Sequence, residues 1–457
     1  MSWYNSSWKY RVKITVDHSK VGSDLTDFPV YVDLSTLPSG FHTNVKSDGG
    51  DIRVTRSDGT TECPREVVFY DSTNDKGELH FKANSLSSTT DTVFYIYYGN
   101  SSASDYATDA TYGAENVWDS SIYHTVHHFK GSTTSLLDST ATHNDGTKKA
   151  NAEPAETSSG KIGYAQDFDG TDDNVVLSDL TYFNGASKIS LSFWLNLDTV
   201  SSTDVFFLKG TTSSTWIQAF MSGGTFTFDI VGTGSRASKN SALTASSDIK
   251  IDVVYDGTQT EDSDQLKLYL NGSYSAWTTL NAIPTTLADT GTQKNYISYP
   301  SSGYAFDGRM DELRIRKDSA TSTWISTEYN NQSSPSTFAT IGTAEEPPAT
   351  SADSERGLYI SGTDTGNSIR GLYLSGSQTL STDYFNVVFS EPSISASGER
   401  GLYVSGYGTD LSERRLYITG STSGSGDRTL YVCGLISNGS ERSLYLQGSL
   451  SSNSERG

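Results

Sequence analysis

Two groups of aspartates, far apart in the chain, have the residue types that could hold a metal ion. The first follows the pattern Asp-Phe-Asp-Gly-Thr-Asp-Asp and the second Phe-Asp-Gly-Arg-Met-Asp-Glu. Their carboxylates would supply the hard oxygen ligands that Ca²⁺ prefers. The candidate calcium ligands are Asp167, Asp169, Asp172, Asp173, Asp307 and Asp311. The alternative is that each Asp-Gly pair only sets a turn, with the aspartate bonding backbone and the glycine taking a positive φ.

Three histidines, His124, His127 and His128, form a second group that could bind a metal. If the segment is a strand, His124 and His128 face one side and His127 faces the other. Only two of them could then converge, which is fewer than the ligands of a zinc site. We therefore expect no zinc site made from these histidines alone.

Aromatic residues near predicted turns are the candidates for sugar binding. A flat ring at such a place can stack on the apolar face of a sugar, although packing in a core is the common alternative. The candidate glycan-binding residues are Trp216, Tyr274 and Trp277.

Motifs for catalysis are missing from the sequence. Glycosidases need two carboxylates across a sugar cleft, and no strand carries the pattern Glu-x-Asp-x-x-Glu. A Gly-x-Ser-x-Gly elbow, a phosphate-binding loop and a His-Glu-x-x-His helix are also absent. The sequence therefore predicts a protein that is not an enzyme.

Alternating apolar and polar residues predict strands that would position these groups. The segment 10–16 alternates cleanly, and Asn271-Gly272 is a strong signal for a hairpin. A short helix is expected from residue 322 to 329. The chain is predicted to be all-β: a β-sandwich over residues 1–110 and a jelly-roll sandwich over 111–343. A linker over 344–352 and a repetitive β-stem over 353–457 would follow.

Five phrases in the first module carry a resemblance to a known family. They are Trp8-Lys-Tyr-Arg, Leu25-Thr-Asp-Phe-Pro-Val, Asp51-Ile-Arg-Val, Ser57-Asp-Gly-Thr and Tyr97-Tyr-Gly-Asn. The module resembles a bacterial and phage domain family of uncharacterised function, which often precedes a laminin-G-like domain. The resemblance implies a fold but no chemistry.

Further phrases in the central module carry a second resemblance. They are Phe168-Asp-Gly, Ser192-Phe-Trp, Tyr255-Asp-Gly, Leu268-Tyr-Leu-Asn-Gly and Phe306-Asp-Gly-Arg-Met-Asp-Glu. This module is similar to the laminin-G or concanavalin A-like lectin superfamily. The resemblance implies a β-sandwich that binds glycans or proteins, often with a structural calcium ion.

A phrase of the form Arg-Gly-Leu-Tyr-x-Ser-Gly returns at a fixed spacing after the linker. Its arginines are Arg356, Arg370, Arg400, Arg414, Arg428, Arg442 and Arg456. Successive positions differ by 14, 30, 14, 14, 14 and 14 residues, and the gap of 30 holds a degenerate copy at Tyr384-Phe-Asn-Val-Val-Phe. A fixed period of this kind indicates a repeat architecture.

Each repeat supplies one short apolar strand and a polar loop, which is too little to enclose the core of a lone solenoid. We therefore predict a trimeric β-shaft similar to those of viral and phage fibres. A monomeric β-solenoid and a low-complexity tail are the alternatives. The predicted oligomerisation residues are Leu358, Tyr359, Leu372, Tyr373, Leu402, Tyr403, Leu416, Tyr417, Leu430, Tyr431, Leu444 and Tyr445.

Composition narrows the possible partners and the compartment. The 33 Lys and Arg residues against 54 Asp and Glu give a net charge of −21, which argues against nucleic acid or an anionic membrane as a partner. The two cysteines, Cys63 and Cys433, lie in different predicted domains and are expected to be free thiols. No signal segment or membrane-spanning run is visible, so we expect a virion or extracellular protein released by lysis.

These features predict a non-enzymatic surface or virion appendage protein, similar to a phage tail or head fibre. Its lectin-like domain would bind host-surface glycans, with calcium as the candidate cofactor. Its partners would be further copies of the same chain. One alternative is a purely structural virion or filament component that contacts other virion proteins. Another is a cellular surface adhesin whose signal peptide is encoded further upstream.

Overall fold

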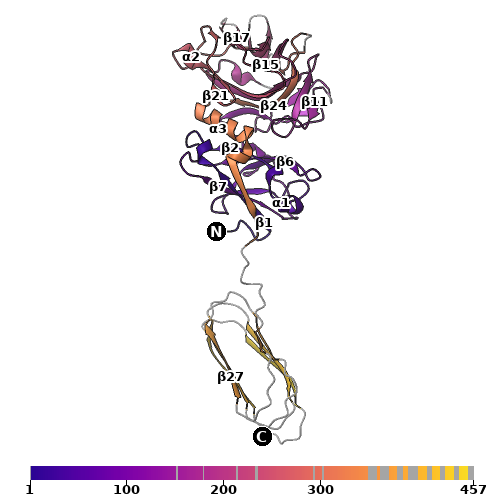
Figure 1. Ribbon diagram of the computed structural model, residues 1–457, viewed down its shortest axis with the longest axis vertical. Coiled ribbons are helices and arrows are strands. Elements are labelled where there is room, and N and C mark those ends of the chain that lie inside the picture. Colours follow the sequence, from indigo (N-terminus) through magenta and orange to yellow (C-terminus); the bar gives the residue numbers. More distant parts are fainter. Residues whose placement is uncertain are drawn as a thin grey trace. The chain divides into compact units, whose positions relative to one another are not determined.

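The computed structural model divides into two compact units, Met1–Pro347 and Pro348–Gly457 (Figure 1). In the first unit it describes residues 2–150, 153–178, 180–212, 215–231, 235–291, 294–300 and 303–347. In the second unit it describes seven strands. The described chain is mostly β-structure, which confirms the predicted all-β class.

The N-terminal part of the first unit is a sandwich of a five-stranded and a three-stranded sheet. The five-stranded sheet has the order β25 (Ala339–Glu345), β1 (Tyr10–Val16), β7 (Thr92–Tyr98), β3 (Arg53–Arg56) and β4 (Glu62–Cys63). The three-stranded sheet has the order β2 (Phe28–Asp33), β6 (Lys76–Ala83) and β5 (Arg65–Asp71). The alternation of β1 places Val12, Ile14 and Val16 in the core, each 0% exposed. Cys63 is a buried free thiol, whereas the side chain of Cys433 lies outside the described residues.

The N-terminal sheet takes its edge strand from a distant part of the chain. Strand β25 runs antiparallel to β1, with Ile341 opposite Ile14. Its last residue, Glu345, accepts a 2.7 Å hydrogen bond from Nε of Arg11. Residues 339–345, which the sequence places at the end of the central module and in the linker, therefore complete the N-terminal sandwich.

The central part is a second sandwich, made of a nine-stranded and an eight-stranded sheet. The nine-stranded sheet has the order β22 (Thr279–Leu280), β18 (Ser235–Lys239), β17 (Thr225–Val231), β16 (Thr215–Ser222), β15 (Thr203–Thr212), β23 (Asn295–Ile297), β13 (Val175–Leu177), β10 (Gly146–Lys148) and β9 (Ser135–Leu136). The other has the order β11 (Ala155–Thr157), β12 (Ala165–Asp169), β24 (Asp307–Arg316), β14 (Lys188–Leu197), β19 (Asp248–Asp256), β20 (Leu266–Leu270) and β21 (Ser273–Tyr274), with β8 (Tyr123–His127) also paired to β24. Phenylalanines from both sheets meet in the core, for example Phe206 and Phe306 with ring centroids 5.3 Å apart.

Short helices connect the strands. They are η1 (His18–Lys20), η2 (Leu34–Thr36), α1 (Ser39–Asn44), η3 (Ala114–Asn116), η4 (Thr181–Phe183), α2 (Asp262–Gln265), α3 (Ser322–Ser333) and α4 (Pro335–Phe338). In the described part of the chain, none of them has the length and apolar character needed to cross a membrane.

Helix α3, predicted from the sequence, lies between the two sandwiches (Figure 1). The hydroxyl of Thr321 caps it by accepting a 3.2 Å hydrogen bond from N of Trp324. Trp324 packs on Phe28 of the N-terminal core, with ring centroids 4.9 Å apart. Tyr329 stacks on Trp194 of the central sandwich at 5.8 Å. The helix therefore contacts both sandwiches, consistent with their forming one compact unit.

The repeats form strands in two parallel sheets within the second unit. One sheet has the order β26 (Leu358–Ile360), β28 (Tyr384–Phe389), β30 (Arg414–Thr422) and β32 (Arg442–Leu450); the other has β27 (Arg370–Ser377), β29 (Arg400–Gly408) and β31 (Arg428–Ile436). Alternate repeats thus join alternate sheets, and their leucines and tyrosines are in register, with Leu402 opposite Leu430 and Tyr403 opposite Tyr431. This pairing within one chain is the pattern of a β-solenoid. The side chains of the predicted oligomerisation residues lie outside the described part.

Candidate functional site

A row of polar residues crosses four neighbouring strands of the eight-stranded sheet. Asp248 on β19 lies opposite Asn196 on β14, which lies opposite Arg309 on β24. Arg309 in turn lies opposite Asp167 on β12. Residues directly opposite in an antiparallel pair share a face of the sheet. Leu195 and the other residues that alternate with this row along the strands pack in the core. The row itself therefore faces outward.

The adjacent row, two residues along each strand, contains Trp194 between Lys250 and Asp311. Trp194 is only 3% exposed. Tyr329 stacks on its ring at 5.8 Å, and Nζ of Lys161 lies 5.5 Å from the ring centroid. Nε1 of Trp194 donates a 2.8 Å hydrogen bond to Gln332 in α3. The indole is therefore fixed in orientation and forms a rigid wall.

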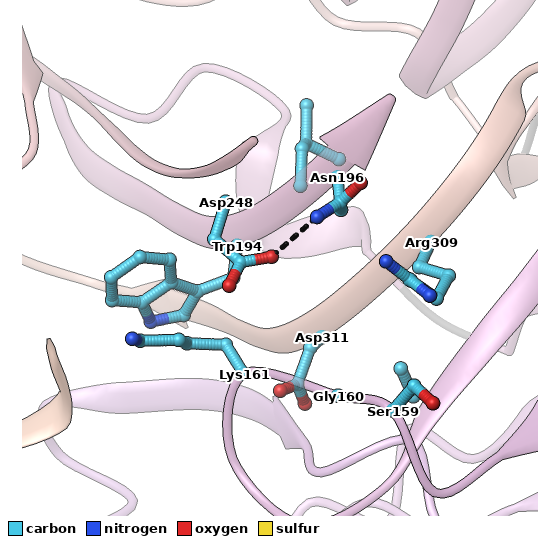
Figure 2. A pocket seen from close by; sticks show the side chains of 10 residues that line it. Ser159, Gly160, Lys161, Trp194, Asn196, Asp248, Arg309 and Asp311 are labelled. Carbon is cyan, nitrogen blue, oxygen red and sulfur yellow. Dashed lines mark hydrogen bonds between the residues drawn. The ribbon is translucent and has the colours of Figure 1, made fainter. Parts of the chain in front are cut away.

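A small pocket with a free volume of about 10 Å³ lies where the two rows meet the loop before β12. Its lining residues are Ser159, Gly160, Lys161, Ala165, Trp194, Leu195, Asn196, Asp248, Arg309 and Asp311. Figure 2 shows Trp194 and Lys161 on one side and Arg309 on the other, with Asn196 and Asp248 between them. A cavity needs about 10–15 Å³ of such volume to hold one water molecule. This pocket therefore has room for about one water, and a larger ligand would contact its rim.

Both hydrogen-bond donors and hydrogen-bond acceptors line the pocket. Nδ2 of Asn196 donates a 2.6 Å hydrogen bond to Oδ1 of Asp248, which leaves Oδ1 of Asn196 and Oδ2 of Asp248 as acceptors. Lys161 and Arg309 supply donors, and the buried Nε of Arg309 has no hydrogen-bond partner among the described residues. Such a mixture suits a ligand with several hydroxyl groups, because each hydroxyl both donates and accepts.

Asp311 belongs to the wall of the pocket and is not free to titrate like a surface carboxylate. Its Oδ2 accepts a 2.7 Å hydrogen bond from N of Ile162. Burial, together with the negative charge of Glu312, raises the pKa of Asp311 well above its ordinary value. Asp311 is therefore a buried residue of β24, held by the loop before β12.

The other predicted calcium ligands fall into two places. Asp172 and Asp173 lie with Glu153, so that one oxygen from each is within 4.8 Å of the others. The ammonium of Lys149 already bridges Glu153 and Asp172, at 2.8 and 2.6 Å. Burial raises the pKa of Asp173 to about 6. A cation of the chain itself therefore neutralises part of this group.

Asp167, Asp169 and Asp307 lie at the paired ends of β12 and β24. Oδ1 of Asp169 accepts a 2.8 Å hydrogen bond from N of Thr171, and Gly170 has a φ of +68°. This is the turn-setting role that the sequence offered as the alternative. Burial and the charge of Asp198 raise the pKa of Asp307. Calcium binding by these residues stays a prediction.

The predicted sugar-binding aromatics do not line the pocket. Trp277 packs in the core, stacked on Phe226 at 6.1 Å, and its Nε1 donates to O of Leu266 at 2.9 Å. Tyr274 is 53% exposed on β21. Trp216 is half-buried on β16 of the other sheet. The three therefore lie outside the pocket, and sugar binding by them stays a prediction.

The pocket residues Lys161, Asn196, Asp248 and Arg309 were not predicted from the sequence. Each is a single polar residue at an outward position of a strand or in a loop, which is common in any β-sandwich. What distinguishes three of them is the register of β19, β14 and β24. Correct strand pairing was the signal needed to find them.

Two family models match the chain, and they confirm the two family resemblances expected from the sequence. The concanavalin A-like lectin/glucanases superfamily matches residues 169–326, and the domain of unknown function DUF2341 matches residues 48–143. The chain therefore carries one domain of each kind. Of the strand residues that line the pocket, only Ala165 on β12 lies outside the lectin-like match. No match was found among curated proteins.

Several solved structures are similar in fold. Domain 4 of AbnA, a GH43 extracellular arabinanase from Geobacillus stearothermophilus in complex with arabinotriose, is 18% identical, with 45% of this chain and 97% of that chain covered and a TM-score of 0.34. The botulinum neurotoxin type G receptor binding domain is 10% identical, with 46% and 51% covered and a TM-score of 0.34. The binding domain of Paraclostridial Mosquitocidal Protein 1 is 11% identical, with 46% and 52% covered and a TM-score of 0.35. This chain thus spans about half the length of the two toxin domains, and the likeness concerns the fold alone.

Proposed function

We propose that this protein is a non-enzymatic surface or virion appendage protein whose lectin-like domain binds a host-surface glycan. The observation that carries the proposal is the polar pocket on the outer face of that domain, lined by Asn196, Asp248, Arg309 and Lys161. The glycan would rest one sugar ring on the rim of this pocket and hydrogen-bond to these four side chains.

The charges of the pocket support a neutral or weakly charged sugar. Two cations, Lys161 and Arg309, stand beside two carboxylates, Asp248 and Asp311, so neither sign prevails. Hydrogen bonds from the sugar to the carboxylate of Asp248 and the amide of Asn196 would fix the orientation of the ring. Because such groups are few, we expect a modest affinity for a single sugar. Repeated copies on an assembled particle would then raise the overall avidity without new contacts.

Removing the Asn196–Asp248 pair is the test of this pocket. The double variant Asn196→Ala with Asp248→Ala removes the acceptors from the pocket, and two hydrogen bonds are worth about 1–3 kcal/mol. We expect binding to the best glycan on an array, remeasured by calorimetry, to weaken about tenfold or more.

The matched control is Asn240→Ala with Asp264→Ala, which removes one exposed amide and one exposed carboxylate elsewhere on the same domain. The control should bind as the unchanged chain does. Equal affinities for the pocket variant and the unchanged chain would reject this pocket. An unchanged chain that binds no glycan and no host cell would reject the adhesive function and favour a structural component.

Assembly through the repeats is the second part of the proposal. The repeats support it because each supplies only one apolar strand, which is too little to enclose a core in one chain. The parallel pairing of the repeats within one chain fits the alternative, a lone solenoid. We expect light scattering of the full chain to give three times the chain mass of 49.5 kDa. Residues 1–347, which form a compact unit, should be monomeric. A full chain that stays monomeric would contradict the trimeric shaft and favour the lone solenoid.

A further inference from the structure

A buried group of two histidines and two glutamates lies between the two sandwiches. Glu78 and His80 belong to β6 of the N-terminal sandwich, His128 follows β8, and Glu312 belongs to β24. All four are buried, with exposures between 0% and 3%. One nitrogen or oxygen atom from each lies within 4.8 Å of the other three. We call these four residues the interface cluster.

Local backbone geometry explains why the four side chains converge. Glu78 and His80 are two residues apart on β6 and share a face, while Leu79 and Phe81 point into the N-terminal core. Glu312 has a φ of +54° and lies where the pairing of β14 with β24 shifts register. Such a bulge re-aims a side chain that regular alternation would place elsewhere. It turns Glu312 toward the N-terminal sandwich.

The distances between these atoms are those of a preformed ligand set. Oε1 of Glu78 lies 2.9 Å from Nε2 of His80 and 3.1 Å from Nδ1 of His128. The same Nδ1 also contacts Oε1 of Glu312. In a tetrahedral site with bonds of about 2.0–2.2 Å, neighbouring ligand atoms are about 3.3 Å apart. Small outward movements would therefore open room for one ion.

The interface cluster lies in a buried network of charged groups. The carboxylates joined to the cluster by ion pairs are Glu66, Glu78, Glu312, Glu328 and Asp252. The permanent cations in the same network are Lys250 and Arg314. Burial opposes a charge on His128, but the carboxylates of Glu312, Glu66 and Glu78 raise its pKa well above the ordinary value. The carboxylates therefore favour a positive charge at this place.

Three atoms of the cluster also lack hydrogen-bond partners among the described residues. They are Oε2 of Glu78, Nδ1 of His80 and Nε2 of His128, all buried. Nε2 of His128 faces Glu66 at 3.3 Å. Burial raises the pKa of Glu78 to about 8 in the absence of an ion. The carboxylate would be ionised at neutral pH once a metal replaced the proton.

We propose that the interface cluster is a structural site for a divalent transition metal, with zinc as the best fit. Two imidazole nitrogens and two carboxylate oxygens are ligands that suit zinc and its neighbours, whereas calcium prefers oxygen ligands alone. Four protein ligands leave no position for a substrate, which is the mark of a structural site. The ion would tie β6 of the first sandwich to β24 of the second.

The full chain itself provides the first test. It is purified without a histidine tag, stripped with a chelator, reloaded with Zn²⁺ and desalted, and its metal content is measured by mass spectrometry. We expect about one zinc per chain, a higher Tm after loading, and with Co²⁺ the intense visible absorption of a tetrahedral site. A stripped chain that takes up no metal, or takes it up with no change in Tm, would overturn the proposal.

Variants then locate the site. His128→Gln and Glu312→Gln should each lose the retained metal and the Tm shift. His143→Gln, whose side chain is 62% exposed, and Asp172→Asn in the exposed acidic group should keep both. Loss of zinc from Asp172→Asn but not from Glu312→Gln would assign the ion elsewhere and overturn the proposal. If His128→Gln does not fold, Glu312→Gln and the Co²⁺ spectrum of the unchanged chain decide.

Discussion

Replacing Glu328 with glutamine is expected to lower the free energy of unfolding of the first unit by about 3–5 kcal/mol. Oε2 of Glu328 accepts a 2.8 Å hydrogen bond from Lys250, and Oε1 accepts a 2.6 Å bond from Arg314. All three residues are buried, with exposures of 4% or less. A neutral amide leaves two buried cations with too little negative charge, and water cannot reach them to compensate.

The physical reason for the large effect is the position of Glu328 on α3. Its carboxylate is the link between Lys250 and Arg314, which otherwise contact different partners, Asp252 and Glu312. Favourable pairing with both cations lowers the pKa of Glu328 to about 2 despite burial, which opposes ionisation. The charged form is therefore the one that the fold requires.

Denaturant unfolding followed by tryptophan fluorescence measures the effect, with residues 1–347 and the full chain compared. The matched control is Glu153→Gln, which removes an equally charged partner from a lysine at the surface. Exposed ion pairs contribute little, so this variant should unfold as the unchanged chain does. If both substitutions shift the midpoint equally, the buried network does not stabilise the unit.

Local pattern was enough to predict the strands and the helix. Strand β1 follows the alternation of its valines and isoleucine, and α3 follows the cap at Thr321 and the apolar residues behind it. These features depend on neighbours in sequence, so a single chain reveals them. The degenerate repeat at Tyr384 also forms a strand, β28, because its apolar residues keep their phase.

The pairing of strands that are far apart in the sequence could not be predicted from local sequence patterns. Strand β25 has a mixed composition, Ala-Thr-Ile-Gly-Thr-Ala-Glu, and only its pairing with β1 shows where it belongs. Likewise His80 and His128 come from different predicted domains, so their contact, with ring centroids 4.6 Å apart, is not visible in the local sequence. Polar residues on alternate positions of β6 predict a solvated face, yet this face is covered by the second sandwich.

The buried interface between the two sandwiches also explains why the sequence did not predict the pocket. The outer face of the eight-stranded sheet is charged, as a solvated face would be, but most of it is covered by α3 and the N-terminal sandwich. Among its charged residues, Lys250 and Arg314 are buried and stabilise the fold. The charged and polar side chains near Asn196 and Asp248, at the edge of the covered area, remain accessible. Sequence alone gives no sign of which charges are covered.

Asp51→Ala is expected to destabilise the N-terminal sandwich by about 3 kcal/mol. The side chain is fully buried and accepts three backbone hydrogen bonds. Oδ1 accepts from N of Lys46 at 3.0 Å, and Oδ2 accepts from N of Gly99 at 2.7 Å and N of Asn100 at 3.0 Å. Hydrogen bonds to a charged group are worth about 1.5–3 kcal/mol each, less where water can replace them.

These bonds give a physical reason for two of the phrases that carried the first family resemblance. Asp51 opens Asp-Ile-Arg-Val, and Gly99 and Asn100 close Tyr-Tyr-Gly-Asn. Gly99 has a φ of +85°, which turns its N–H and that of Asn100 toward the same oxygen. The carboxylate thus joins the start of β3 to the end of β7, and the two phrases form one structural unit.

Two variants separate this role from a general effect of losing an aspartate. Asp51→Asn keeps one acceptor oxygen and should lose less stability than Asp51→Ala. Asp71→Ala removes an exposed aspartate that also accepts two backbone hydrogen bonds, from Thr73 and Asn74, and should change stability much less because water replaces the carboxylate. Thermal unfolding of all three, followed by circular dichroism, measures the order. Equal losses for Asp51→Ala and Asp71→Ala would show that burial of Asp51 adds nothing, and that the link between β3 and β7 has another source.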